Sequence, residues 1–371
     1  MKYYLIAGER SGDLHGSHLI KALQECDSEA QVRGWGGDFM KNAGMDLVVH
    51  YKNLAFMGIW EVLTNIITIK RYLDRCKEDL LSYQPEVLIL IDYPGFNLKM
   101  AAFAHKHRIP VCYYISPKIW AWNQRRVLKI KKYVDRMYAI LPFEKEFYQR
   151  FQYKVDYVGN PLVETTGEVP KDLSFRTRHG LNHQPLIAVL PGSRKQEIQH
   201  MLGLMLDLVG AFPQHNFVVA AVDNIPREYY QIALQRNNVK VVFNETYPLL
   251  TMSCAALVAS GTASLETALF GVPQVVCYKT SWLTYLAAKM VVKVNYISLV
   301  NLIAGDEVVP ELLQGDFNRD NLQKQLQEIA VDGPTQKTQL TGYRKVKVLL
   351  GNKKASQETA RLIYEFLQTK G

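Results

Sequence analysis

The residues best suited to chemistry stand mid-chain, where an apolar run ends in a Pro-Gly-Ser-Arg turn. Leu186 to Leu190 predicts a buried strand, Pro191-Gly192 breaks it, and Ser193 can cap the helix that follows. The first turn of such a helix presents unpaired backbone N–H groups and a positive dipole end, to which Arg194 adds a permanent cation. This pattern favours a phosphate site at Gly192, Ser193 and Arg194. The alternative is an ordinary strand-helix joint with a solvated arginine, because the turn is neither a Walker loop nor a Gly-x-Gly-x-x-Gly fingerprint.

A second helix start of this kind follows the apolar run Ala255 to Ala259. Its small residues are Ser260, Gly261, Thr262 and Ala263. Glu266 lies one turn into the helix and could accept hydrogen bonds from a diol, although an acid there often only compensates the helix dipole. Together, one start with an arginine and one with a glutamate outline a diphosphate and a ribose, so the pair favours a nucleotide site.

A carboxylate follows the most continuous apolar run of the first half. Val87 to Ile91 is typical of a central parallel strand, and Asp92 stands just past its carboxyl end. Ligands bind at that edge of open α/β sheets, so Asp92 is a candidate general base. The alternative is a carboxylate that only caps the turn before Pro94.

Cations and tryptophans gather between Lys118 and Arg136. This stretch has seven cations against one anion, with Trp120 and Trp122 at its front and Arg125 and Arg126 next. Such a composition suits an anionic membrane surface or a phosphorylated amphiphile. It could also hold nucleic acid, but no RNA or DNA module signature accompanies it, and a merely solvated basic face is the third alternative.

The stretch Leu54 to Ile69 is almost entirely apolar and is followed at once by Lys70-Arg71. It could be a core helix. The overall charge favours instead a helix that lays Trp60 and Ile66 into a lipid interface with cations at its rim.

The composition places broad limits on the protein. The chain has 371 residues, 48% hydrophobic and 21% charged, which is typical of a soluble protein with two domains. Its net charge of +9 implies an anionic partner. No apolar run is long enough to cross a bilayer, and the first apolar run is too short for a signal peptide, so we expect a cytoplasmic protein. Five scattered cysteines and nine histidines form no metal motif, so no metal is expected.

Strands and helices alternate along the whole chain, which predicts an α/β fold with two doubly wound halves. The polar stretch Val163 to Lys171 is interpreted as a linker. We therefore expect one domain over residues 1–163 and a second over 164–345. The amphipathic C-terminal segment, residues 346–371, is expected to pack back on the first domain.

Motifs throughout the chain resemble those of the lipid-A-disaccharide synthase family, in register from residue 2 to about 350. They include Ala7-Gly8-Glu9 with Ser11-Gly12-Asp13, Ile91-Asp92 with Phe96-Asn97, Ser116-Pro117 with Trp120-Ala121-Trp122, Leu190-Pro191-Gly192-Ser193-Arg194, Ser260-Gly261-Thr262-Ala263 with Leu265-Glu266, and Ser298-Leu299 with Asn301-Leu302. The resemblance implies an inverting glycosyltransferase of GT-B fold, in which two Rossmann-like domains face a central cleft.

The resemblance also implies a reaction and roles for residues. The donor would be UDP-2,3-diacylglucosamine and the acceptor 2,3-diacylglucosamine 1-phosphate (lipid X), giving a β-1,6 disaccharide and UDP, with no cofactor and no nucleic acid. Asp92 would be the base, with Glu9 and Ser11 on the acceptor side. Arg194 and the two helix starts would hold the departing UDP, with Glu266 on the ribose and Asn301 also on the UDP-sugar side. Both lipid substrates imply peripheral association with the anionic inner membrane, and the sequence leaves open whether the protein is a monomer or a homodimer.

Two other functions stay open at this point. A UDP-sugar 2-epimerase has a comparable architecture and uridine site but does not need interfacial tryptophans. A non-catalytic nucleotide-sugar or lipid-binding protein would not need Asp92.

Overall fold

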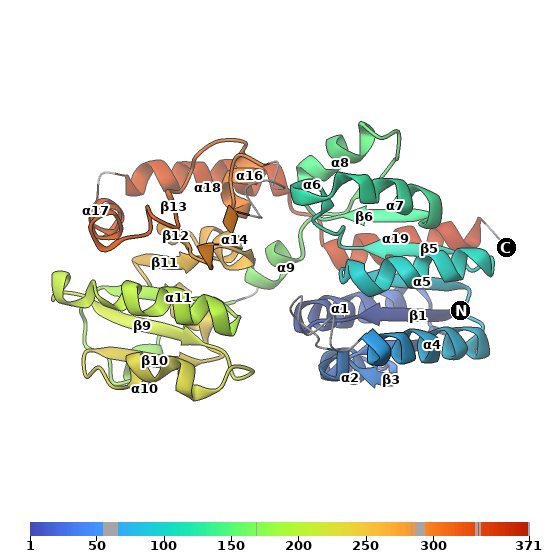
Figure 1. Cartoon of the computed structure of the whole chain (residues 1–371), viewed down its shortest axis with the longest axis horizontal. Coiled ribbons are helices and arrows are strands. Elements are labelled where there is room, and N and C mark those ends of the chain that lie inside the picture. Colours follow the sequence, from blue (N-terminus) through green and yellow to red (C-terminus); the bar gives the residue numbers. More distant parts are fainter. Residues whose placement is uncertain are drawn as a thin grey trace. The chain divides into compact units, whose positions relative to one another are not determined.

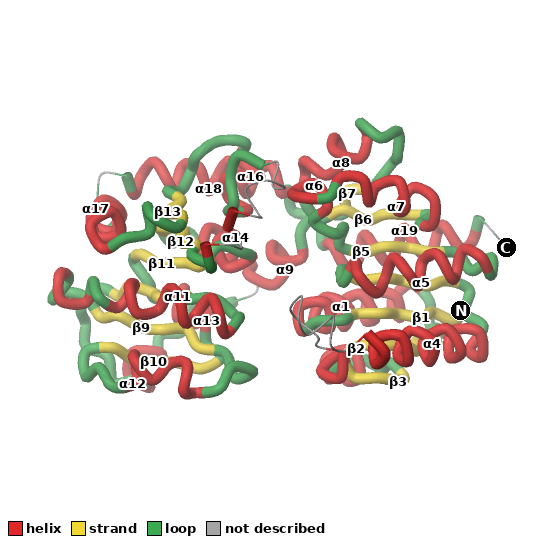
Figure 2. Tube along the Cα trace, viewed as in Figure 1, coloured by secondary structure: helices red, strands yellow, loops and turns green. Residues whose placement is uncertain are grey.

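The chain divides into two compact units, which the computed structural model describes over residues 1–54, 66–167, 169–282, 285–286, 294–330, 333 and 335–369 (Figure 1). Unit 1 comprises Met1–Pro161 and Asn352–Gly371, and unit 2 comprises Leu162–Gly351. The sequence placed these boundaries at residues 163 and 345. Each unit contains a parallel sheet flanked by helices (Figure 2), so the predicted α/β fold class is confirmed.

Unit 1 contains a seven-stranded sheet in the order β3-β2-β1-β4-β5-β6-β7, and every described pairing in it is parallel. The strands are β1 Lys2–Ala7, β2 Gln31–Gly36, β3 Asp46–His50, β4 Val87–Ile91, β5 Val111–Tyr114, β6 Arg136–Ala139 and β7 Asp156–Tyr157. All five residues of β4 are buried, as expected for a central strand with helices on both faces.

The helices of unit 1 include one from the far end of the sequence. They are α1 Arg10–Cys26, α2 Asp38–Asn42, α4 Ile66–Tyr83, α5 Pro94–Lys106, α6 Ile119–Trp122, α7 Val127–Tyr133, α8 Pro142–Gln149 and α19 Ala355–Gln368. Figure 1 shows α19, in red, beside the blue and cyan elements of this unit. Its apolar face, with Ala360 and Ile363, shares one buried cluster with Leu19 and Ile20 of α1, which anchors the C-terminal segment.

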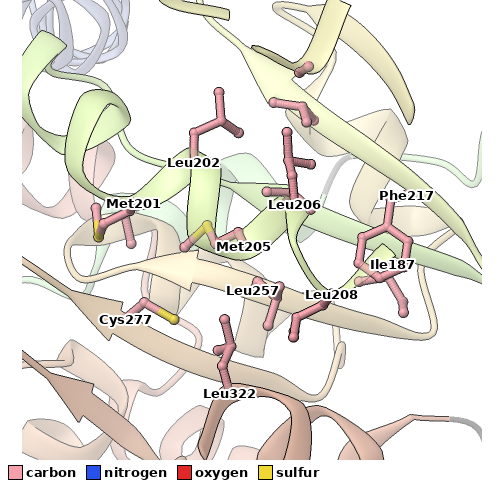
Figure 3. Close-up of a cluster of buried hydrophobic side chains, with 14 of the residues drawn as sticks. Ile187, Met201, Leu202, Met205, Leu206, Leu208, Phe217, Leu257, Cys277 and Leu322 are labelled. Atoms are coloured by element: carbon pink, nitrogen blue, oxygen red, sulfur yellow. The ribbon is translucent and has the colours of Figure 1, made fainter. Parts of the chain in front are cut away.

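Unit 2 contains a six-stranded parallel sheet in the order β10-β9-β8-β11-β12-β13. The strands are β8 Leu186–Leu190, β9 Asn216–Ala221, β10 Val239–Phe243, β11 Ala255–Ala259, β12 Gln274–Tyr278 and β13 Glu311–Leu313. Its larger core cluster joins strand residues such as Ile187 and Leu257 to Met201 and Met205 of helix α11, Lys195–Leu206 (Figure 3). The buried residues of this helix, Ile198, Met201, Leu202 and Met205, recur at helical spacing, so one face of the helix packs on the sheet.

The first helix after unit 1, α9, begins at Pro161 and includes Val163 to Gly167, so the first part of the stretch interpreted as a linker is helical. The helices of unit 2 are α9 Pro161–Gly167, α10 Phe175–Arg178, α11 Lys195–Leu206, α12 Gln231–Leu234, α13 Thr246–Thr251, α14 Thr262–Leu269, α16 Leu299–Ala304, α17 Arg319–Ile329 and α18 Gln336–Leu350. The chain thus passes from one unit to the other at the start of α9.

Each sheet has a point where the direction of winding reverses. In unit 1 this point lies between β1 and β4, where Ala7 pairs with Ile91, and in unit 2 between β8 and β11, where Leu190 pairs with Val258. Ligands of doubly wound sheets bind in the crevice beyond the carboxyl ends of such neighbouring strands. The segments singled out in the sequence follow these four strands.

Candidate active site

Asp92 follows β4 on a backbone turn that few side chains adopt. Asp92 has φ +44° and the next residue, Tyr93, has φ +49°, so two successive non-glycine residues are left-handed. The Asp92 carbonyl oxygen accepts a hydrogen bond from Asn97 Nδ2 at 2.7 Å and another from the Tyr113 hydroxyl. These two side chains hold the turn, whose strain is of order 1–3 kcal/mol per residue.

The Asp92 carboxyl group is a weaker acid than an ordinary aspartate. Burial raises its pKa to about 6, the Glu9 carboxylate also raises the pKa, and the Lys118 ammonium group and the Tyr93 backbone amide lower it. Glu9 and Lys118 follow β1 and β5, the two neighbours of β4. Asp92 therefore has the acidity that suits a general base near neutral pH.

Glu9 and Ser11 lie at the start of α1. Glu9 is the N-cap residue and is half-buried, and Ser11 is exposed in the first helical turn. Gly8 precedes them because a Cβ there would overlap the Tyr93 ring. This close approach lets the first turn of α1 lie beside Asp92 at the point where the winding reverses.

Sequence reasoning assigned no role to Asn97, Tyr113 or Lys118. Asn97 appeared only in a motif and Lys118 only in a run of cations, and Tyr113 was not singled out. A signal was available in the sequence. Tyr113 lies in the strand next to β4, and Lys118 lies in the loop after that strand, so Lys118 belongs to the same sheet edge as Asp92.

In unit 2, two backbone amides at the start of α11 already donate hydrogen bonds to a side chain of the same helix. The Glu197 carboxylate accepts hydrogen bonds from the backbone amides of Ser193 at 3.0 Å and Arg194 at 3.2 Å. Gly192 has φ +109°, and a Cβ there would overlap this carboxylate. The prediction that Ser193 caps the helix is wrong: Arg194 is the N-cap residue, and Glu197 supplies the acceptor.

The Arg194 side chain nevertheless stays available to a ligand. It is 68% exposed and forms a long ion pair with Glu197, in which Nη1 and Oε1 are 3.6 Å apart. A loose, exposed ion pair of this kind contributes little to stability. The guanidinium group can therefore turn toward a diphosphate at small cost.

The start of α14 differs from that of α11. Among the described residues, no side chain accepts a hydrogen bond from the backbone amides of Thr262 or Ala263, and Thr262 is exposed. Gly261 is the N-cap residue, and the Ser260 hydroxyl donates to the Ile297 carbonyl oxygen at 3.1 Å. These amides are the ones that an anion at a helix N-terminus uses.

Glu266 lies one turn further along α14 and is half-buried. Its Oε1 atom accepts a hydrogen bond from the Tyr247 hydroxyl at 2.8 Å. Burial raises the pKa of Glu266, and the hydrogen bond from Tyr247 lowers it. Within the described part of the chain, no group donates a hydrogen bond to the Oε2 atom of Glu266.

Asn301 does not fit the direct contact with the UDP-sugar that the sequence predicted. Its side chain is 0% exposed, and both amide atoms are fully used. Oδ1 accepts from the amides of Val308 and Val309, and Nδ2 donates to the Val309 carbonyl oxygen and to Glu311. An asparagine amide makes at most four such bonds, so none remains for a substrate. This prediction is corrected: Asn301 holds the segment around residues 308–311.

The two tryptophans of α6 lie in different environments. Trp120 is 5% exposed, and its Nε1 atom donates to Glu144 Oε1 at 3.1 Å. Glu144 is fully buried and also accepts from the amides of Ile140 and Leu141, and burial raises its pKa to about 7. The interfacial role predicted for Trp120 is corrected, because a buried indole that bonds to a core carboxylate presents no face to lipid.

Trp122 is the exposed member of the pair. It is 43% exposed, and the Arg126 guanidinium group lies over its ring at 4.6 Å from the centroid. Arg125 is exposed beside it, and Leu128 is 64% exposed on α7. These four residues, Trp122, Arg125, Arg126 and Leu128, form the basic-aromatic surface of unit 1.

The other predicted membrane residues are described only in part. Trp60 lies outside the described residues, and Ile66 is the first residue of α4, where the neighbouring Ile67 is 75% exposed. Over the described segments, no helix combines the length and apolar character needed to span a bilayer. In those same segments, no group of three or more histidine, cysteine, aspartate or glutamate side chains is arranged to hold a metal ion.

Comparison with known families identifies the group to which this site belongs. The family model described as lipid-A-disaccharide synthetase matches residues 3–364. The chain belongs to the lipid-A-disaccharide synthase family. A lipid-A-disaccharide synthase from Myxococcus xanthus (strain DK1622) is 36% identical over 370 residues, which cover 98% of this chain and 97% of the relative. The activity is that of a lipid-A-disaccharide synthase, a glycosyltransferase of lipid A biosynthesis, which excludes the epimerase and non-catalytic alternatives.

Solved structures support the fold of this synthase. UDP-GlcNAc 2-epimerase from Neisseria meningitidis, bound to UDP-GlcNAc, superposes with a TM-score of 0.68 at 15% identity and covers all of both chains. A glycotransferase of kitacinnamycin gives a TM-score of 0.68 at 13% identity over 99% of both chains. At these identities the likeness shows the two-unit GT-B fold and nothing about the substrate.

Proposed function

We propose that this synthase transfers 2,3-diacylglucosamine from UDP-2,3-diacylglucosamine to the 6-hydroxyl of 2,3-diacylglucosamine 1-phosphate. The reaction forms the β-1,6 disaccharide phosphate and releases UDP, with inversion at the anomeric carbon. The observation that carries the mechanism is the Asp92 carboxyl group, whose pKa of about 6 is set by burial and by Glu9. A neutral-pH base at the acceptor hydroxyl is what a single-displacement transfer requires.

In this mechanism Asp92 takes the proton of the acceptor 6-hydroxyl as that oxygen bonds to the anomeric carbon of the donor. The bond from that carbon to the diphosphate breaks, and the electron pair leaves with UDP. Glu9 supports the base by keeping its pKa raised, and Ser11 contributes the exposed hydroxyl and amide of the first α1 turn to the acceptor side. Lys118 opposes Glu9, so the pair tunes the base.

UDP binding is assigned to unit 2. At the uncapped start of α14, residues Ser260 to Ala263, backbone amides donate hydrogen bonds to the diphosphate. Arg194 neutralises the negative charge that develops on the diphosphate as UDP leaves. The start of α11, with Gly192 and Ser193, plays the smaller part because Glu197 already occupies two of its amides. The Glu266 carboxylate accepts hydrogen bonds from the ribose hydroxyls. These positive groups take the place of a metal ion.

The membrane contact is assigned to the basic-aromatic surface of unit 1. Exposed Trp122 and Leu128 supply apolar contact, and Arg125 and Arg126 supply the charge that anionic headgroups attract. The protein then binds the inner membrane peripherally, where both lipid substrates reside.

The test is an assay of purified protein with the donor and the acceptor phosphate in the presence of EDTA. We expect formation of the disaccharide and stoichiometric release of UDP, with the new linkage in the β configuration. Activity that appears only after a divalent cation is added would refute the metal-independent mechanism, and an α linkage would refute inversion.

A further inference from the structure

The hydroxyl group of Tyr247 fixes the carboxylate that is assigned to the ribose. Tyr247 lies on α13 and donates to Glu266 Oε1 at 2.8 Å. Its ring also packs against the Phe270 ring, with centroids 5.2 Å apart. The hydroxyl makes a further hydrogen bond with the Thr165 side chain of α9. Three contacts therefore hold this tyrosine in place, two from α14 and its C-cap residue and one from α9.

A carboxylate that recognises two neighbouring hydroxyls must be ionised and correctly oriented. Burial favours protonation of Glu266, and the hydrogen bond from Tyr247 opposes it by lowering the pKa. Because Tyr247 holds Oε1, the rotation of the carboxylate is limited and Oε2 keeps one direction. A glutamate without this partner would lose more side-chain entropy when it bound a diol.

We propose that Tyr247 is a positioning residue for nucleotide recognition, which holds Glu266 so that its second carboxylate oxygen accepts the hydroxyls of the ribose. This inference rests on the proposed ribose role of Glu266. Tyr247 itself does not touch the nucleotide in this account. It sets the discrimination between a ribonucleotide and a deoxyribonucleotide.

The experiment compares UDP with its 2′-deoxy and 3′-deoxy analogues by calorimetry, on wild-type protein and the Tyr247→Phe variant. We expect the Kd for UDP to rise about threefold to tenfold, the range of one hydrogen bond, while the Kd for the deoxy analogue that lacks the bound hydroxyl changes much less. The acid limb of UDP binding should also move to higher pH, since Glu266 loses the donor that keeps it ionised.

The control is Tyr153→Phe in unit 1, which removes a tyrosine hydroxyl that donates to the Val134 carbonyl oxygen at 2.9 Å. This variant should match Tyr247→Phe in loss of thermal stability and leave the Kd for UDP and its pH dependence unchanged. If Tyr247→Phe weakens UDP and both deoxy analogues equally, with no shift of the acid limb, the tyrosine is only structural and the inference is overturned.

The Glu266→Gln variant separates this inference from the proposed function. If Glu266→Gln loses the preference for UDP and Tyr247→Phe keeps it, the ribose role stands and the positioning role falls. If Glu266→Gln itself keeps the preference and the affinity for UDP, the ribose role falls, and the inference falls with it. If Tyr247→Phe does not fold, Thr165→Val tests the same hydroxyl: a shifted acid limb with reduced preference supports the inference, and wild-type behaviour overturns it.

Discussion

The carboxyl edges of the two sheets share a topology and differ in their chemistry. In unit 1 the segments after β1, β4 and β5 bring together Glu9, Asp92 and Lys118, with Asp92 on a left-handed turn that Asn97 and Tyr113 hold. In unit 2 the segments after β8 and β11 offer helix N-termini and the exposed guanidinium group of Arg194. The edge in unit 1 carries a carboxylate with a raised pKa, and the edge in unit 2 carries fixed positive charge.

This difference suits the two units to different parts of a glycosyl transfer reaction. Fixed dipoles and an arginine, which keeps its charge at all accessible pH values, suit an anion that must be held and released. A carboxylate whose acidity is set by its neighbours suits a proton that must be taken. Unit 1 should therefore control turnover and its pH dependence, and unit 2 should control affinity for UDP.

The largest expected effect is that of Asp92→Asn on turnover. The amide cannot accept the acceptor proton, so we expect kcat to fall by about 10²–10⁴-fold, the usual contribution of a general base. The measurement is disaccharide formation at saturating donor and acceptor. Unchanged turnover would remove Asp92 as the base and end the assignment of chemistry to unit 1.

The next effect belongs to unit 2. Arg194→Ala should raise the Kd for UDP by about tenfold or more, because a hydrogen bond to a charged group contributes roughly 1.5–3 kcal/mol. Lys195→Ala is the matched control, since Lys195 is an adjacent exposed cation whose Nζ atom lies over the Tyr229 ring. Calorimetry with UDP measures both variants, and equal affinity in the two would count against the phosphate role.

The two tryptophans of α6 give a comparison within unit 1. Trp122→Ala should weaken sedimentation with anionic vesicles about threefold to tenfold, because exposed apolar area and a stacked arginine are lost. Trp120→Phe should leave vesicle binding intact and lower the free energy of unfolding by about 1–3 kcal/mol, since the buried Glu144 carboxylate loses a donor. The reverse pattern would show that the surface has been assigned to the wrong side chain.

The smallest effect is a shift of the pH profile. With an Asp92 pKa of about 6, kcat/KM should fall below pH 6 as the carboxylate is protonated. Glu9→Gln removes a charge that raises this pKa and should move the acid limb to lower pH, whereas Lys118→Ala should move it to higher pH. Lys145→Ala, an exposed lysine on α8, is the control. Limbs that do not move in opposite directions would contradict the tuning of Asp92 by these two residues.

The positions of the central strands were predictable from the sequence, because buried parallel strands consist of short runs of apolar residues. Leu186 to Leu190 and Val87 to Ile91 both coincide with observed strands. The edge that ligands use follows from strand order, so Asp92 and Arg194 could be placed at the ends of strands without knowledge of the structure.

Side-chain partners distant in sequence were not predictable in the same way. Trp120 and Trp122 are two positions apart, so on a helix they project about 160° apart, to nearly opposite sides, and they are not expected to share one environment. Which one is buried depends on Glu144, a partner that local composition does not indicate. Likewise, the saturation of the Asn301 amide depends on a loop and a strand that follow it.

The most direct test of the division between the units is the affinity of the Asp92→Asn protein for UDP, measured by calorimetry on the same preparation that is used for the turnover assay. We expect a Kd within about twofold of wild type, together with a turnover reduced by orders of magnitude. A tenfold loss of UDP affinity in this variant would contradict this division, because the base would then belong to the nucleotide site.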